Sequence, residues 1–140
     1  MKLLRDNRAN GGVSFLVIVF LLMFILVNFV PLVETVYNEI FIVIAYTKTL
    51  DVMQHTGGLT VAIENATLDM LEDAGFTRGN ITITGTVATV PYGDQIGVTI
   101  EYSDTVKNYV YNGKFGMTAV DEVKNYEMSG STISYYYDNN

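Results

Sequence analysis

Few side chains suited to acid–base or nucleophilic chemistry occur in this 140-residue chain. It has one histidine, His55, and no cysteine, which excludes disulfides, thiolate metal sites and cysteine nucleophiles. Asp51 precedes His55 by four residues and could orient its imidazole on a helix, but no serine stands in a strand–turn–helix elbow. A base without a nucleophile performs no acyl transfer, so we interpret His55 as a solvated structural residue. The sequence therefore predicts no catalytic residue and no enzyme.

A metal or phosphate site is also not expected. Asp69, Glu72 and Asp73 lie within about one helical turn of each other. They lack the spaced oxygen ligands and the glycine of a calcium loop, so we interpret them as a solvated helix face. No glycine-rich segment has the strand–loop–helix context of a phosphate-binding loop. We expect no metal and no cofactor.

The most informative segment is residues 13–33, which carries no formal charge. A helix of 21 residues rises about 30 Å, which matches the hydrocarbon thickness of a bilayer. One alternative is a buried core helix, but the remaining residues supply no partner helices for it. The other is a cleaved secretory signal, but this run is longer than a signal's apolar region and no small-x-small site follows. We predict a retained transmembrane helix.

Charge asymmetry predicts the orientation of this helix. Three bases and one carboxylate precede Val13, a balance of +2, whereas five bases and fourteen carboxylates follow, a balance of −9. Lys and Arg beside a span are retained in the cytoplasm, so residues 1–12 form a cytoplasmic basic tail. The acidic remainder is then extracytoplasmic, and it offers no surface for nucleic acid. The expected location is the cell membrane, with a single pass.

Apolar spacing beyond the span predicts an α+β fold. Residues 34–56 continue at helical spacing as a stem that ends at Gly57 and Gly58, and residues 57–140 form an external α+β domain. The domain opens with a second helix that Gly75 stops. From Asn80 the period becomes two, which indicates a small antiparallel sheet.

Turn residues predict three hairpins in this sheet. A loop at Pro91–Asp94 pairs Val90 with Gln95 and hence Gly85 with Ile100. The Asn112–Gly113 turn pairs Val110 with Phe115 and Tyr111 with Lys114. A Gly130–Ser131 turn sets Met128 opposite Ile133 and Tyr126 opposite Tyr135.

Two features suggest where partners bind. Asn28 is a polar residue in hydrocarbon and Pro31 frees a backbone carbonyl nearby, so together they are candidate helix-packing residues. The alternative is tolerance close to the outer interface. Tyr135, Tyr136 and Tyr137 are candidate surface contacts, because alternate members of a strand point to opposite faces; strand propensity explains them equally well.

The layout of the chain resembles the type IV pilin-like proteins. A basic tail, Arg8-Ala9-Asn10-Gly11-Gly12, runs into an apolar helix and stem, followed by HTGGLTVAIENATLDMLEDAGF and NITITGT. This order is most similar to the TadE-like pseudopilins and related single-span proteins of pilus-assembly, conjugation or secretion loci. The resemblance implies Gly11 and Gly12 as a candidate processing site. Val17 stands where prepilins carry a glutamate, which favours an uncleaved N-terminus.

These observations predict a non-enzymatic, membrane-anchored component of a pilus-like, conjugative or secretion assembly. The resemblance implies homologous pilin-like subunits or assembly platform proteins as partners. The alternative is a stand-alone membrane-anchored extracellular binding or sensing domain.

Overall fold

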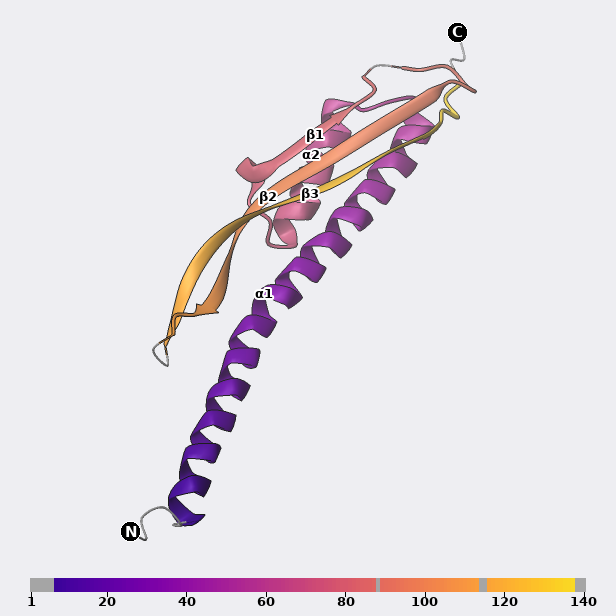
Figure 1. The fold of residues 1–140 in the computed structure, drawn as a ribbon. Helices are drawn as coiled ribbons and strands as arrows, with labels where there is room; N and C mark the ends of the chain where they lie inside the picture. The colour runs from indigo at the N-terminus through magenta and orange to yellow at the C-terminus, as the bar shows by residue number, and fades with distance from the viewer. Residues whose placement is uncertain (1–6, 88, 114–115, 138–140) are drawn as a thin grey trace, which may run out of the picture. The chain divides into compact units, whose positions relative to one another are not determined.

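The computed structural model describes residues 7–87, 89–113 and 116–137 (Figure 1). The chain forms a long N-terminal apolar helix, a second helix and a three-stranded antiparallel sheet, which confirms the α+β prediction. In chain order, the elements are α1 (Asn7–Thr56), α2 (Val61–Asp73), η1 (Arg78–Asn80), β1 (Ile81–Gly85), β2 (Gln95–Tyr111) and β3 (Met117–Ile133). Residues 1–6 of the expected basic tail lie outside the described residues.

The chain divides into two compact units. Unit 1 comprises residues 1–34 and 107–122, and unit 2 comprises residues 35–106 and 123–140. The long helix and the two long strands each contribute to both units. The expected stem, residues 34–56, therefore belongs, apart from Glu34, to the same compact unit as α2 and β1.

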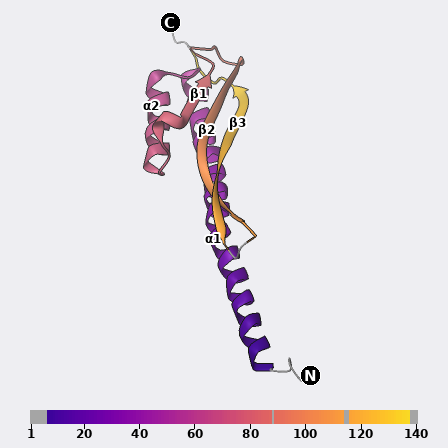
Figure 2. The ribbon, with the colours of Figure 1, turned by 60° about the vertical axis from the view of Figure 1, so that its left-hand side comes forward.

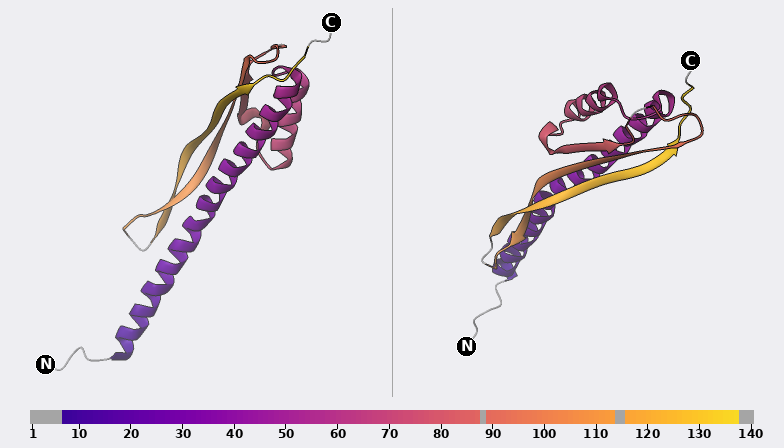
Figure 3. Two further views of the ribbon diagram at one scale, coloured as in Figure 1. Left: turned by 90° about the vertical axis from the view of Figure 1, so that its right-hand side faces the viewer. Right: turned by 90° about the horizontal axis from the view of Figure 1, so that it is seen from above.

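Both helices of unit 2 lie on one face of its sheet (Figures 2 and 3). The core between them is apolar, and both helices, all three strands and the connecting segments contribute to it: Ile42, Ala45, Met53, Leu59, Ile63, Leu71, Phe76, Ile81, Ile96, Val98, Ile100, Tyr102 and Tyr126. One polar contact is buried with them, a 2.7 Å hydrogen bond between the hydroxyls of Thr49 and Thr67. The stem is thus part of the core of the domain, because it carries apolar residues at helical spacing on the face that meets the sheet.

The helix ends lie where glycine was expected to place them. After α1, Gly57 adopts a φ of +76°, and the amides of Gly57 and Gly58 both donate to the Met53 carbonyl. After α2, Gly75 has a φ of +97°, and the Phe76 amide donates to the Leu71 carbonyl. Both stops are confirmed, since a left-handed residue lets the chain turn back onto the last helical carbonyls.

The predicted pairing of β1 with β2 is wrong by two residues. Gly85 pairs with Val98 rather than with Ile100, and Ile83 pairs with Ile100. The chain leaves the sheet after Gly85: Val87 forms a parallel bridge with Leu59, and the Val90 amide donates to the Gly57 carbonyl. A shift of two keeps the same side chains on the core face, so alternation alone does not reveal it.

The predicted turn at Gly130–Ser131 is also wrong, because β3 runs without interruption to Ile133. Gly130 lies inside the strand, where a Cβ would overlap the Tyr46 hydroxyl and lie 3.1 Å from its ring carbon Cζ. The glycine therefore admits a tyrosine from α1 against the strand backbone. The Asn112–Gly113 turn lies between β2 and β3, with Gly113 at a φ of +80°, and its predicted partners at 114 and 115 lie outside the described residues.

Candidate interaction surfaces

The segment after β3 is held in place by main-chain hydrogen bonds to two other parts of unit 2. The Ser134 amide donates to the Asp94 carbonyl at 2.8 Å, and the Gly93 amide donates back to Ser134 at 3.0 Å. The Tyr135 amide donates to the carbonyl of Gln54, in the last turn of α1. The tyrosines that follow are therefore carried by a fixed backbone outside any strand.

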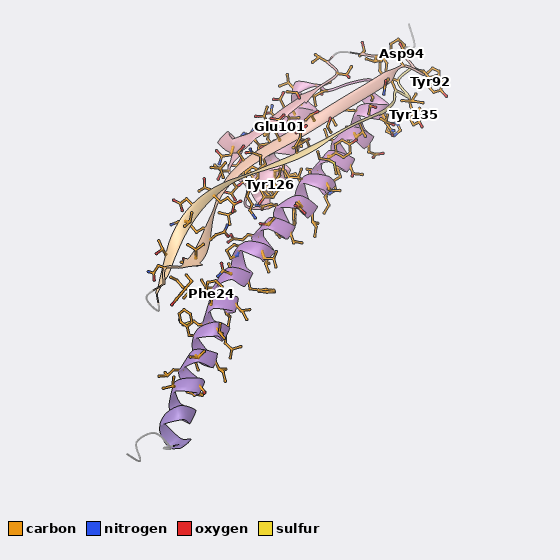
Figure 4. The ribbon with its side chains drawn as sticks, viewed as in Figure 1. Phe24, Tyr92, Asp94, Glu101, Tyr126 and Tyr135 are labelled. Carbon is orange, nitrogen blue, oxygen red and sulfur yellow. The ribbon has the colours of Figure 1, made fainter. Side chains whose placement is uncertain are left out.

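Tyr92, Tyr135 and Tyr137 form an exposed aromatic cluster, here called the tyrosine cap. The rings of Tyr92 and Tyr137 stack with centroids 4.6 Å apart and an interplanar angle of 19°, and Tyr135 lies 6.1 Å from Tyr92. Figure 4 shows Tyr92, Asp94 and Tyr135 together at this end of unit 2. The three side chains keep 48–65% of their surface exposed. Ordered, exposed tyrosines are typical of protein-binding surfaces, because each supplies a large rigid contact area.

The remaining predicted tyrosine, Tyr136, and the histidine lie outside the cap. Tyr136 turns inward, and its Cβ lies where a side chain on Gly57 would have to be. His55 is exposed, with its ring 6.3 Å from that of Tyr135. The sequence analysis missed Tyr92 as a member of the cap, although the Pro91–Asp94 loop had placed it at a turn.

Desolvation and the neighbouring Tyr92 raise the pKa of one member of the cap, Tyr137. Desolvation first, and then the Tyr92 hydroxyl, raise the pKa of Tyr137 above its ordinary value of 10.0. The Tyr137 hydroxyl therefore stays protonated, as a hydrogen-bond donor, through the physiological range.

The expected acidic helix face holds an arginine. Arg78 Nη1 lies 2.6 Å from Asp69 Oδ1 and 3.2 Å from Glu72 Oε2, and its Nη2 donates to Asn65 Oδ1. The hydrogen bond that Arg78 donates to Asp69, followed by the one that it donates to Glu72, raises the pKa of Arg78. Within the described part of the chain, no group of three metal-ligating side chains is present.

Unit 1 contains one apolar helix that is long enough to span a membrane. Fifteen large apolar side chains between Val13 and Val33 are 42–69% exposed, so the helix is apolar around most of its circumference. A single stripe is covered, and its members are Phe20, Phe24, Val27, Asn28 and Pro31. Gly11 and Gly12 lie on this helix, exposed and with no neighbouring atoms.

The covered stripe contacts the end of the β2–β3 hairpin. Asn28 Nδ2 donates to the Phe24 carbonyl at 2.9 Å, and Asn28 Oδ1 accepts from the Tyr109 amide at 3.3 Å. The ring of Tyr111 meets that of Phe20 edge-on, with centroids 5.9 Å apart. Both predicted packing residues, Asn28 and Pro31, thus lie on the partly buried stripe of the helix. Part of this stripe is covered by the β2–β3 hairpin of the same chain.

Comparisons with protein-family models, curated proteins and solved structures give no match to this chain.

Proposed function

We propose that this chain is a non-enzymatic, membrane-anchored component of a pilus-like, conjugative or secretion assembly, similar to the TadE-like pseudopilins. In this role residues 13–33 cross the membrane, the basic tail is cytoplasmic, and unit 2 presents its surface outside. The partners are homologous pilin-like subunits or assembly platform proteins.

The observation that carries the proposal is a difference in side-chain exposure between two parts of α1. Between Val13 and Val33 fifteen large apolar side chains are exposed, whereas Ile42, Ala45 and Met53 of the same helix are buried in the core of unit 2. Exposed apolar surface on this scale is stable only in lipid or against other helices. The same helix, α1, thus supplies both the apolar run and part of the core of unit 2.

The first test is topology, measured with protease protection in whole cells. A tag after Asn140 should be cleaved from outside, and a tag before Lys2 should be protected, because the bases of the tail are retained in the cytoplasm. A C-terminal tag protected inside the cell would reverse the orientation. Intact-mass measurement of the purified protein should show an N-terminus that precedes Gly11, and a chain starting at Gly12 or Val13 would show processing.

The second test separates the two candidate roles by exchanging residues 11–33 for an unrelated transmembrane helix. If the chain acts through assembly of its helix, cross-linking in native membranes should lose the complexes of the wild-type chain. Complexes that survive the exchange would assign partner binding to the external part. That outcome favours the alternative, a stand-alone anchored binding domain, for which the tyrosine cap is the supporting observation.

A further inference from the structure

Unit 2 contains a groove of about 350 Å³ between α1 and β3. Glu39, Ile42 and Val43 of α1 form one wall, and Asn125, Tyr126, Glu127 and Met128 of β3 form the other. Ile42, Val43 and Met128 supply apolar surface to the groove, and each wall carries one carboxylate, Glu39 or Glu127. Neither Glu39 nor Glu127 has an ion-pair partner among the described residues.

The lining residues show that the groove runs along the edge of β3. Four consecutive residues line it, and consecutive residues of a strand point to opposite faces. Asn125 lies on the outer face, where its amide oxygen accepts from Ser103, whereas Tyr126 stacks on the core residue Tyr102 at 6.0 Å. A single cavity can contact side chains of both faces of the sheet only where it runs along the edge of the strand. β3 is an edge strand of the sheet, so its outer main-chain groups are not paired with another strand there.

A second and independent observation is the hydroxyl of Tyr126. This residue is 7% exposed, and its hydroxyl is buried without a hydrogen-bond partner in the described structure. Tyr126 is one of the residues that line the groove, and Figure 4 shows its label between β3 and α1. A buried hydroxyl without a partner costs free energy, and a phenylalanine would fill the same space without that cost. The hydroxyl is therefore explained by a partner that arrives from outside.

We propose that this groove binds an extended, basic segment of a partner protein, which adds to the sheet beside residues 125–128. Main-chain pairing with the edge of β3 supplies affinity, as in other cases of strand addition. A Lys or Arg side chain of the segment that points toward α1 lays its methylenes on Ile42 and Met128 and reaches the carboxylate of Glu39, and one that points to the outer face reaches the carboxylate of Glu127. The Tyr126 hydroxyl donates to an acceptor of the segment. The net charge of −9 after Val13 favours a basic partner.

The proposal goes beyond an assembly role, because it rests on unit 2 and holds for either candidate function. The probe is a blocked six-residue peptide of alternating Val and Lys, with the alternating Val and Glu peptide as its counterpart. Binding is measured on the full-length chain in nanodiscs, by calorimetry at two salt concentrations and by amide hydrogen exchange.

We expect saturable binding of the lysine peptide, with slower exchange at residues 125–128 and weaker binding at high salt. The double variant Glu39→Gln/Glu127→Gln should lose this binding. Asp73→Asn, which changes an exposed carboxylate at the end of α2, is the matched control and should bind as the wild type does. Tyr126→Phe should unfold at a higher temperature without peptide and bind the peptide about five- to tenfold more weakly.

Three results would overturn the proposal. They are absence of binding, equal binding of the glutamate peptide, and unchanged binding by the double glutamate variant. Concentration-dependent protection of residues 125–128 without any peptide would also overturn it, because the groove would then belong to a second copy of the chain. None of these results bears on the outcome of the topology or anchor-exchange experiments. The groove proposal and the proposed assembly function can therefore be refuted independently of each other.

Discussion

Asn28 Oδ1 accepts a hydrogen bond from the main-chain amide of Tyr109, 81 positions further along the chain. The same side chain donates to the Phe24 carbonyl, so both ends of the amide are paired within one molecule. A polar residue in an apolar helix is expensive unless it is paired. In the absence of a bilayer, Asn28 therefore holds the end of the β2–β3 hairpin against the helix.

Asn28→Leu should release this end of the hairpin. The Tyr109 amide loses its acceptor, so its exchange with deuterium should accelerate, and the free energy of unfolding should fall by about 1 kcal/mol. Hydrogen exchange in detergent measures the first effect and denaturant titration the second. Ser14→Ala, at an exposed position of the same helix, is the control and should change neither. Unchanged exchange at Tyr109 would show that the hydrogen bond does not hold the hairpin.

Lipid should compete with the hairpin for the same stripe of the helix. Phe20 lies 13 residues before Val33, a rise of about 20 Å, so Tyr111 at Phe20 would lie deep in the bilayer if residues 13–33 were embedded. The hairpin end also carries Lys107, Asp121 and Glu122, and strand edges exposed to hydrocarbon leave main-chain groups unpaired. We therefore expect the hairpin to leave the helix in a membrane.

A cysteine pair tests this competition in a chain that has no cysteine of its own. Phe20→Cys/Tyr111→Cys should cross-link with a short bifunctional reagent in detergent and much less in vesicles. Tyr92→Cys/Tyr137→Cys, from the tyrosine cap, is the control and should cross-link equally in both. Equal cross-linking of the first pair in vesicles would show that hairpin and helix stay together in lipid.

Removal of the stem should unfold the external part. Ile42, Ala45 and Met53 of α1 are at most 2% exposed in the core of unit 2, and a fragment starting at Gly57 lacks them. Each buried large side chain contributes about 1.5–3 kcal/mol, which is comparable with the whole stability of a small domain. Residues 35–140 should give dispersed NMR spectra, whereas residues 57–140 should give those of an unfolded chain. A cooperatively folded 57–140 fragment would contradict this.

Gly130→Ala should destabilise unit 2 through a clash with Tyr46. The added Cβ would overlap the Tyr46 hydroxyl, and overpacking of this kind costs about 1–3 kcal/mol. Tyr46→Phe removes the hydroxyl and leaves the ring carbon at 3.1 Å, so the double variant should recover part of the loss. Denaturant titration measures all three chains. Gly79→Ala, where no atom lies within 4 Å of the new Cβ, is the control; equal losses in the single and double variants would exclude this clash.

Alkaline pH should weaken unit 2 in part through Tyr102. Burial first, and then the charge of Asp104, raise the pKa of Tyr102 above its ordinary value of 10.0. Because the folded state holds this proton more tightly, its contribution is complete below about pH 10 and is lost as the pH rises through the folded pKa. Tyr102→Phe should therefore flatten the fall of unfolding free energy above pH 10. Tyr135→Phe, at an exposed position, should leave the slope unchanged.

Local patterns were sufficient for the elements of this protein. The apolar run 13–33, the helical spacing of residues 34–56 and the stops at Gly57 and Gly75 predict α1 and α2 because helix period and helix ends depend on neighbouring residues. The alternation after Asn80 predicts strands for the same reason. The α+β class follows from these elements, and it is confirmed.

The register of β1 and the continuity of β3 were decided by distant contacts. Val87 and Val90 pair with the turn between α1 and α2, which shifts β1 by two residues while the core face stays the same. Gly130 has the sequence signature of a turn, but its small size serves the approach of Tyr46. In both cases the deciding partner lies far away in the chain, where turn propensity carries no information.

The candidate interaction surfaces were likewise determined in part by the sequence and in part only by the tertiary structure. The sequence by itself identified an apolar helix, Asn28 within it and the row of tyrosines near the C-terminus. Only the tertiary structure decided that Tyr92 joins Tyr135 and Tyr137, and which stripe of the helix is covered. The physical reason is that a uniformly apolar helix has no preferred face of its own, so contacts made by a distant hairpin select one.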